Sequence, residues 1–330
     1  MQMGKVSEAI LKRSVLRQIK QRRDEVLQRP GVGVDCTALG IGEEEGMLLT
    51  SNPITVSKEL LPSTAIHSAV ADIRAAGGDI IGVMLTILLP KDSQESQLQN
   101  IMKEAENTAK AYNLEIIGGH TEITSYVNRP VITVTGVGKI RRSRVTASAG
   151  VLPGDEIVMT KWAGLLGTAI LAKEHTQELL TRYNRDFIQN AEDFTAFLSI
   201  AADADIGEEA GVKLMHNPSR GGIFAALWEL GVRTGLGLTA DLRKIPIRQE
   251  TIEICEFFDL NPYQLYSAGS LLLVTGKGNE LAEKLNDSGI PAVVIGRFTD
   301  GNARTIRNQE EERFLEPPKT DELYQVNVVK

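Results

Sequence analysis

The sequence predicts a mixed α+β protein built from two domains. Its 330 residues exceed the ~150 that are usual for one domain, and each half is long enough to bury a core of its own. Apolar runs of strand length alternate with segments of helical period in both halves, which is the order expected of α/β or α+β layers. Hydrophobic residues make up 42% of the chain and charged residues 24%, so wholesale disorder is excluded.

The first half, residues 1–150, is expected to hold its elements in the order β, α, β, α, β, β. One helix ends at Gly77 and Gly78, where glycine accepts the left-handed conformation of a C-terminal cap at little cost. The apolar run that follows, up to Pro90, indicates a strand buried on both faces. The stretch 118–129 has the composition of a turn. The expected strands are 47–56, 80–89, 114–117 and 130–140, and the expected helices are 65–76 and 93–112.

The first thirty residues have a basic amphipathic pattern. Ile10, Leu11, Val15 and Ile19 form one stripe, and most of the basic side chains lie outside it. Such a pattern is typical of a helix docked on the protein with its charged face in solvent. Binding to an anionic membrane surface is the alternative interpretation.

The second half, residues 151–330, is expected to form another α/β domain beyond a seam near 140–153. The stretch 177–190 is ambiguous. From about residue 309 the chain is charged, carries Pro317 and Pro318 and loses its period, so we expect a weakly ordered tail. The expected strands are 155–160, 212–215, 236–242, 270–276 and 292–298, and the expected helices are 163–174, 193–211, 221–234, 248–258 and 279–288.

Charge and composition exclude several classes of protein. The chain has 36 Lys and Arg against 43 Asp and Glu, a net charge of −7, so we expect no nucleic-acid partner. The longest uncharged apolar stretch is far shorter than the ~20 residues of a membrane span, and the first thirty residues lack the apolar core of a secretory signal. Cys36 and Cys255 are far apart without metal-ligand spacing. We therefore expect a cytoplasmic protein with two free thiols and no membrane partner.

The motif NPSRGG at 217–222 is a candidate anion site. Its glycines open a predicted helix, and a helix N-terminus beside Arg220 attracts anions such as phosphate. A purely structural left-handed turn with a solvated Arg220 is the alternative. The Gly-rich turns around Asp35 and at 118–122 share this plan. Neither a P-loop nor a Rossmann fingerprint is present, so any phosphate site is of another kind.

Several acidic residues are candidate metal ligands. Asp35, Asp72 and Asp79 are candidates, with His120 and Glu122 beside them. Mg²⁺ prefers oxygen ligands and needs only one or two protein carboxylates when phosphates complete its shell. For Asp72, a solvated carboxylate on a helix is the alternative. The four histidines have no zinc-protease pattern.

Eight motifs, in order, resemble the superfamily of aminoimidazole ribonucleotide synthetase, thiamine-monophosphate kinase, selenophosphate synthetase and the hydrogenase-maturation protein HypE. The likeness is strongest to HypE-like, AIR synthase-related proteins, and it extends to about residue 304. The motifs are GKVSEAIL at 4–11, PGVGVDCTAL at 30–39, SNPITVSK at 51–58, AVADIRAAGG at 69–78, GGHTEIT at 118–124, MHNPSRGGIFAALWEL at 215–230, IPIRQETIEICEFFDLNP at 245–262 and YSAGSLLLV at 266–274.

The resemblance implies a PurM-like fold of two domains, 1–150 and 151–330. It implies a homodimer whose N-terminal domains share a β-barrel flanked by helices, with ATP in a groove and Mg²⁺ between phosphates and acidic side chains. Asp35 and Asp72 match metal-binding positions, and His120 and Arg220 match positions that act on the transferring phosphate. The remaining positions implied to contact the cofactor are Gly4, Lys5, Asp35, Asn52, Gly119, Thr121, Asn217, Ser219, Gly221 and Gly222.

The implied activity is ATP- and Mg²⁺-dependent activation or phosphorylation of an oxygen acceptor, either a small molecule or one carried by a protein. Asn52 and Asn217 stand where the family usually has aspartates, which weakens the attraction for Mg²⁺. HypE itself modifies a C-terminal cysteine, whereas this chain ends VNVVK, so we expect a different acceptor. A non-catalytic nucleotide-binding or scaffolding relative is the alternative, and a thiamine-monophosphate kinase is a narrower one.

Overall fold

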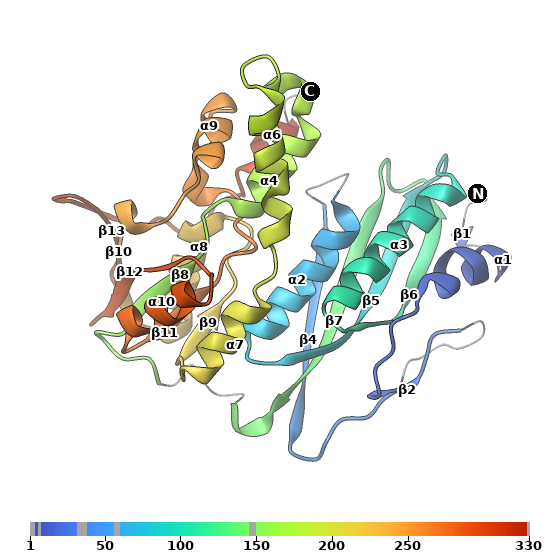
Figure 1. Ribbon diagram of the computed structural model, residues 1–330, viewed down its shortest axis with the longest axis horizontal. Helices are drawn as coiled ribbons and strands as arrows, with labels where there is room; N and C mark the ends of the chain where they lie inside the picture. The colour runs from blue at the N-terminus through green and yellow to red at the C-terminus, as the bar shows by residue number, and fades with distance from the viewer. Residues whose placement is uncertain (1–3, 6–7, 32–37, 56–59, 145–149, 329–330) are drawn as a thin grey trace. The chain divides into compact units, whose positions relative to one another are not determined.

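The computed structural model describes residues 4–5, 8–31, 38–55, 60–144 and 150–328 (Figure 1). The chain divides into two compact units, of which unit 1 comprises Met1–Arg74 and Gly78–Val145, and unit 2 comprises Ala75–Gly77 and Thr146–Lys330. Both units combine a β-sheet with helices, so the predicted mixed α+β class is confirmed. Within the described ranges no helix has the length and apolar character needed to cross a bilayer.

Unit 1 is built on a five-stranded sheet with the order β1-β6-β5-β7-β4. β5 and β6 are parallel and the other neighbours are antiparallel. The predicted dimeric barrel needs a second chain and stays a prediction. The strands are β1 (Gly4–Lys5), β4 (Glu45–Ile54), β5 (Asp79–Pro90), β6 (Glu115–Thr124) and β7 (Val131–Arg141).

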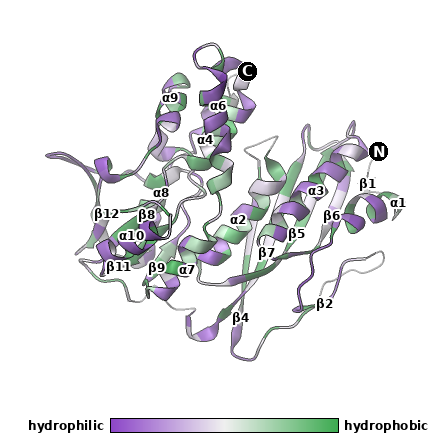
Figure 2. Ribbon diagram, in the orientation of Figure 1, coloured by the Kyte–Doolittle hydropathy of each residue, from purple (hydrophilic) through white to green (hydrophobic). Residues whose placement is uncertain are grey.

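Helices α2 (Leu61–Ala75) and α3 (Glu95–Ala111) cover one face of this sheet (Figure 1). Alternate residues of β5, from Val83 to Leu89, point toward the helices and form one apolar core with Ile66, Ile73 and Leu98. Figure 2 shows mostly hydrophilic residues along the visible side of α3, as expected for a helix with one buried stripe.

The opposite face of the unit 1 sheet is covered in part. A small sheet of β2 (Val26–Gln28) and β3 (Ala38–Leu39) packs on it through Val26, against Ile81, Ile117 and Val137. Beyond that contact the face carries apolar side chains in solvent. The exposed ones are Met47 (45%), Leu49 (66%) and Met84 (40%).

The N-terminal arm, residues 8–29, is docked on unit 1, in agreement with the docked-helix interpretation. Its helix is short, comprising α1 (Glu8–Ile10), a π-helical turn and a 3₁₀ turn, and its apolar stripe packs on the unit 1 core. Carboxylates of α3 and β6 accept hydrogen bonds from the arm. These bonds are Ser14 Oγ to Glu95 Oε1 (2.7 Å), Lys20 N to Glu106 Oε1 (2.7 Å) and Arg29 Nε to Glu115 Oε1 (2.8 Å).

Unit 2 contains a seven-stranded sheet with the order β14-β13-β10-β12-β8-β11-β9. Its strands are β8 (Glu156–Thr160), β9 (Leu214–His216), β10 (Gly237–Asp241), β11 (Leu272–Thr275), β12 (Ala292–Thr299), β13 (Arg304–Asn308) and β14 (Glu311–Phe314). Its helices are α4 (Leu165–Glu174), α5 (Thr176–Leu179), α6 (Arg185–Glu192), α7 (Ala201–Glu209), α8 (Gly222–Thr234), α9 (Gln249–Phe257), α10 (Gly278–Asp287) and α11 (Leu323–Val328).

Three sequence expectations differ from the structure. The stretch 118–124 is strand rather than turn, because a bulge beside Gly118 lets β6 stay paired with β5 up to Thr124. The helix expected over 193–211 is a 3₁₀ turn followed by α7. The region after residue 309 was expected to be weakly ordered, but it forms β14 and α11, and Leu323 is fully buried. Local composition did not reveal the long-range contacts that hold this region.

Candidate functional site

Asp72 and Asn52 meet in unit 1. Asp72 lies on α2, and its Oδ2 accepts hydrogen bonds from Asn52 Nδ2 and from Thr50 Oγ1, both at 2.7 Å. Thr50 and Asn52 are two residues apart on β4, so their side chains lie on the same face of the sheet. Thr50 was missed by sequence reasoning, although its spacing from Asn52 is the signal that could have found it.

His120 is on the other face of the same sheet. It lies on β6 opposite Thr86 and contacts Glu122, with His120 Nε2 3.2 Å from Glu122 Oε2. Thr121 is buried, and because neighbours on a strand point to opposite faces, it turns away from His120. The two side chains therefore lie on opposite faces of the sheet, and their expected contact with phosphate or metal stays a prediction.

The other predicted site residues of unit 1 lie in different parts of that unit. Gly119 has a φ of 142°, and a Cβ there would collide with the Leu85 carbonyl, so this position requires glycine for close approach of β5. Gly4 and Lys5 form the edge strand β1, paired with β6. Asp35 and Cys36 lie outside the described residues.

In unit 2, Asn217, Ser219, Arg220, Gly221 and Gly222 form the turn between β9 and α8, as predicted. Gly221 and Gly222 both have positive φ, 81° and 66°. A Cβ on Gly222 would overlap the Tyr263 carbonyl oxygen and lie 2.8 Å from the Leu265 carbonyl oxygen. Glycine is thus needed here for the left-handed backbone and for close packing against the neighbouring loop.

The carboxylate of Asp321 lies at the amino end of α8. Its Oδ2 accepts the Gly221 N–H at 2.6 Å, and its Oδ1 accepts the Leu323 N–H at 2.9 Å. Burial raises the pKa of Asp321 to about 6, although backbone N–H groups and the charge of Arg220 lower it. The anion site expected from the NPSRGG motif therefore holds a carboxylate of this same chain, which sequence reasoning missed.

Cys255 is also near Asp321. The thiol is free and 1% exposed, and burial, with the Glu322 and Asp321 carboxylates, raises its pKa to about 12. A thiol in this state is a poor nucleophile, so Cys255 is a structural residue.

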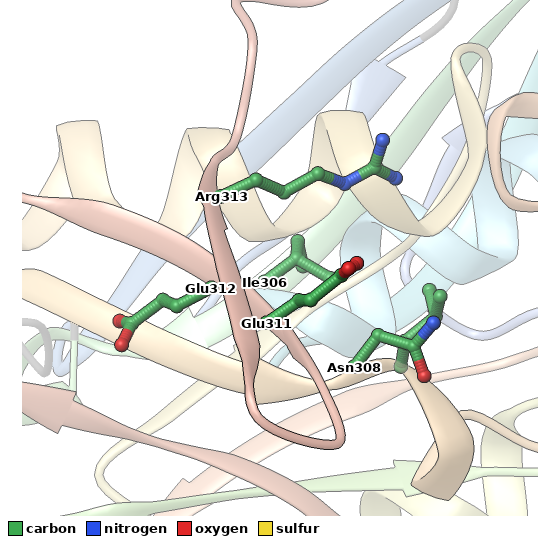
Figure 3. A pocket seen from close by; sticks show the side chains of 6 residues that line it. Ile306, Asn308, Glu311, Glu312 and Arg313 are labelled. Atoms are coloured by element: carbon green, nitrogen blue, oxygen red, sulfur yellow. The ribbon is translucent and has the colours of Figure 1, made fainter.

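Two cavities in unit 2 flank the β13–β14 hairpin. The larger, about 470 Å³, is lined by Leu242, Ile306, Asn308, Glu311, Glu312 and Arg313. Figure 3 shows Glu311 and Arg313 extending to one side of β14 and Glu312 to the other. The second, about 270 Å³, is lined by Phe224, Asn261, Gln264, Ile306, Arg313, Phe314, Leu315 and Glu316. Neither is lined by a predicted site residue.

The unit 1 cluster fits Mg²⁺ weakly. Asp72 supplies one carboxylate, Thr50 a hydroxyl and Asn52 an amide, and one carboxylate suffices when phosphates supply the other ligands. Among the described residues, no group of three or more His, Cys, Asp or Glu side chains is arranged to hold a metal ion.

Both halves of the chain match one family. The family model described as "AIR synthase related protein, N-terminal domain" matches residues 33–140, and the one described as "AIR synthase related protein, C-terminal domain" matches residues 153–307. The chain belongs to the AIR synthase related family. Together the two matches cover most of the chain.

Curated relatives in this family are about one quarter identical to the chain. A putative hydrogenase expression/formation protein of Methanocaldococcus jannaschii is 25% identical over 283 residues, which cover 83% of this chain and 81% of the relative. The carbamoyl dehydratase HypE of Cupriavidus necator is 24% identical over 249 residues, covering 73% of this chain and 69% of that protein.

Solved structures share the fold of this AIR synthase related protein. HypE of E. coli has a TM-score of 0.81 at 15% identity, covering 97% of this chain and 100% of that chain. A HypE solved in complex with ATP has a TM-score of 0.75 at 16% identity, covering 96% and 95%. A thiamine-monophosphate kinase from Stenotrophomonas maltophilia has a TM-score of 0.69 at 17% identity, covering 88% and 93%.

The close approach at Gly222 gives a stability prediction. Gly222→Ala should lower the free energy of unfolding by roughly 2–4 kcal/mol, because it adds a steric overlap to the cost of a left-handed alanine. Gly235→Ala is the matched control, since Gly235 has a φ of 71° and open space around it, and should cost only about 1 kcal/mol. Urea unfolding measures both, and equal losses would contradict the packing role of Gly222.

Proposed function

We propose that this chain is an ATP- and Mg²⁺-dependent enzyme that activates or phosphorylates an oxygen acceptor in hydrogenase maturation. The observation that carries the proposal is the family match over both halves, joined to the likeness to a HypE solved with ATP. The names of the relatives from M. jannaschii and C. necator support the link to hydrogenases. The acceptor would be a small molecule or a group carried by a protein.

In this proposal, N–H donors and a guanidinium bind phosphate, and carboxylates bind Mg²⁺. Arg220 and the backbone at Gly221 and Gly222 would hold a phosphate group, since N–H donors and a guanidinium suit its oxygens. Asp72, with Asp35, would hold Mg²⁺, an ion that neutralises charge developing during phosphoryl transfer. His120 lies on the face of the unit 1 sheet opposite to Asp72, so it would act on a ligand bound at that face.

A non-catalytic, nucleotide-binding or scaffolding role is the second candidate. The hydrogen bond from Asn52 to Asp72 favours it, because the amide supplies a donor to the carboxylate where a second carboxylate would demand a cation. Such a pair is satisfied without metal.

We also propose that the chain is a homodimer that joins through the exposed face of the unit 1 sheet. Met47, Leu49 and Met84 leave an apolar face in solvent, which is the character of a protein interface. A second copy of the same face would cover it.

Nucleotide binding is tested by isothermal titration with ATP and Mg²⁺. Arg220→Ala should weaken binding by roughly tenfold or more, because a charge-assisted contact to phosphate is lost. Arg243→Ala removes an exposed arginine of the same unit and should leave affinity unchanged. Absence of heat and of any thermal shift at millimolar nucleotide would contradict the proposed function.

The two candidates are separated by Asn52→Asp. The new carboxylate would face Asp72, so the variant should melt below the wild type in a chelator and regain that loss with millimolar Mg²⁺. The exposed Asn128→Asp is the control, and its melting temperature should respond to Mg²⁺ as the wild type does. A large Mg²⁺ stabilisation already in the wild type favours the enzyme, whereas one confined to Asn52→Asp favours the non-catalytic role.

The dimer is tested by Leu49→Asp. A charge on the exposed sheet face should shift the protein toward monomer in light scattering or sedimentation, without loss of its circular dichroism spectrum. Val232→Asp places the same charge on an exposed apolar position of α8 and should leave the mass unchanged. A wild type that is monomeric at high concentration would contradict this interface.

A further inference from the structure

The C-terminal segment, residues 317–328, passes directly over the amino end of α8. The Lys319 carbonyl oxygen lies 3.8 Å from where a Cβ of Gly221 would be, and Asp321 then binds the Gly221 N–H. Two further contacts continue the docking. Leu323 is fully buried, and Glu322 Oε2 accepts the Asn261 N–H at 3.1 Å.

The Asp321 carboxylate uses the donors that a phosphate would need. It accepts the Gly221 N–H, lies within the field of Arg220 and is only 3% exposed. Carboxylates and phosphates are recognised by the same groups, namely backbone N–H donors at a helix N-terminus and guanidinium. A phosphate and the Asp321 carboxylate cannot both accept a linear hydrogen bond from the Gly221 N–H.

We propose that the C-terminal segment is a built-in competitor of the nucleotide, with the Asp321 carboxylate occupying the phosphate position at the amino end of α8. This inference rests on the proposed function, because it names what holds that position when nucleotide is absent. Nucleotide binding then requires Asp321 and the residues around it to leave the turn.

The segment has the features of a part that can detach. Residues 316–320 are exposed, and Pro317 and Pro318 lie between β14 and the docked residues. A cavity of about 270 Å³, lined in part by Phe224, Gln264 and Glu316, opens beside it, so packing on this side is incomplete. The segment can therefore leave without breaking the strand pairs of the unit 2 sheet.

The tethered Asp321 carboxylate would lower the apparent affinity of the protein for nucleotide. A tethered carboxylate acts at a high effective concentration, and a ligand that binds only the open form loses affinity in proportion to the open fraction. Removing the carboxylate raises that fraction and tightens apparent binding. Asp321→Asn keeps one acceptor oxygen but loses the charge, so it weakens the contact without removing the segment.

Two measurements test the proposal, both with MgATP as the probe. By titration, Asp321→Asn should bind ATP about tenfold more tightly than the wild type, and so should a chain ending at Glu316, which keeps the buried Leu315. Glu316 is exposed, lies just before the segment and pairs with Lys319, and Glu316→Gln should bind ATP as the wild type does. By hydrogen–deuterium exchange, ATP should speed exchange of residues 317–328 in the wild type.

The outcomes separate this inference from the proposed function. If the wild type binds ATP but Asp321→Asn and the shortened chain, both folded by circular dichroism, bind no more tightly, the competitor role is overturned and the proposed function stands. ATP that binds the wild type and slows exchange in the segment also overturns it. If no form binds ATP, the proposed function and the competitor role fail together.

Discussion

The burial of the Asp321 carboxylate is the interaction on which the site in unit 2 depends. Removing an ionised carboxyl from water is costly, and proteins tolerate it where backbone donors and a cation surround it. Gly221 and Leu323 supply N–H groups, and Arg220 supplies positive charge. The glycines of the turn are what allow these groups to converge, because a side chain on Gly222 would displace the loop of Tyr263.

In unit 1 the acidic group is Asp72, and its partners differ from those of Asp321. Asp72 receives two neutral donors, from Thr50 and Asn52, rather than a second acid. The cluster therefore attracts a cation less strongly than two facing carboxylates would. The same amide that weakens the case for metal also makes the pair stable without one.

Much of the fold could be predicted from sequence because its strands and helices have clear periods. The apolar run after Gly78 predicted β5 within a residue, and α8 and α9 were placed almost as closely. β6 was predicted too short, because a bulge that continues pairing leaves no periodic signature.

The site was predictable only where it is local in sequence. The turn at 217–222 was placed correctly from its glycines, and Asp72 was placed on its helix. The occupant of that turn was not, since Asp321 is a hundred residues away and its segment has a polar, aperiodic composition. His120 and Thr121 were assigned through the family resemblance, which does not reveal that the strand sends their adjacent side chains to opposite faces.

The position of β4 at the edge of the unit 1 sheet constrains how the chain is made. Its neighbour in the sheet is β7, which begins at Val131, long after β4 ends at Ile54. A ribosome adding ~5–20 residues per second needs several seconds to cover that interval, during which the backbone of β4 has no native partner. Leu49 and Met47 add apolar side chains to this unpaired strand, so the nascent chain is open to aggregation until β7 has been synthesised.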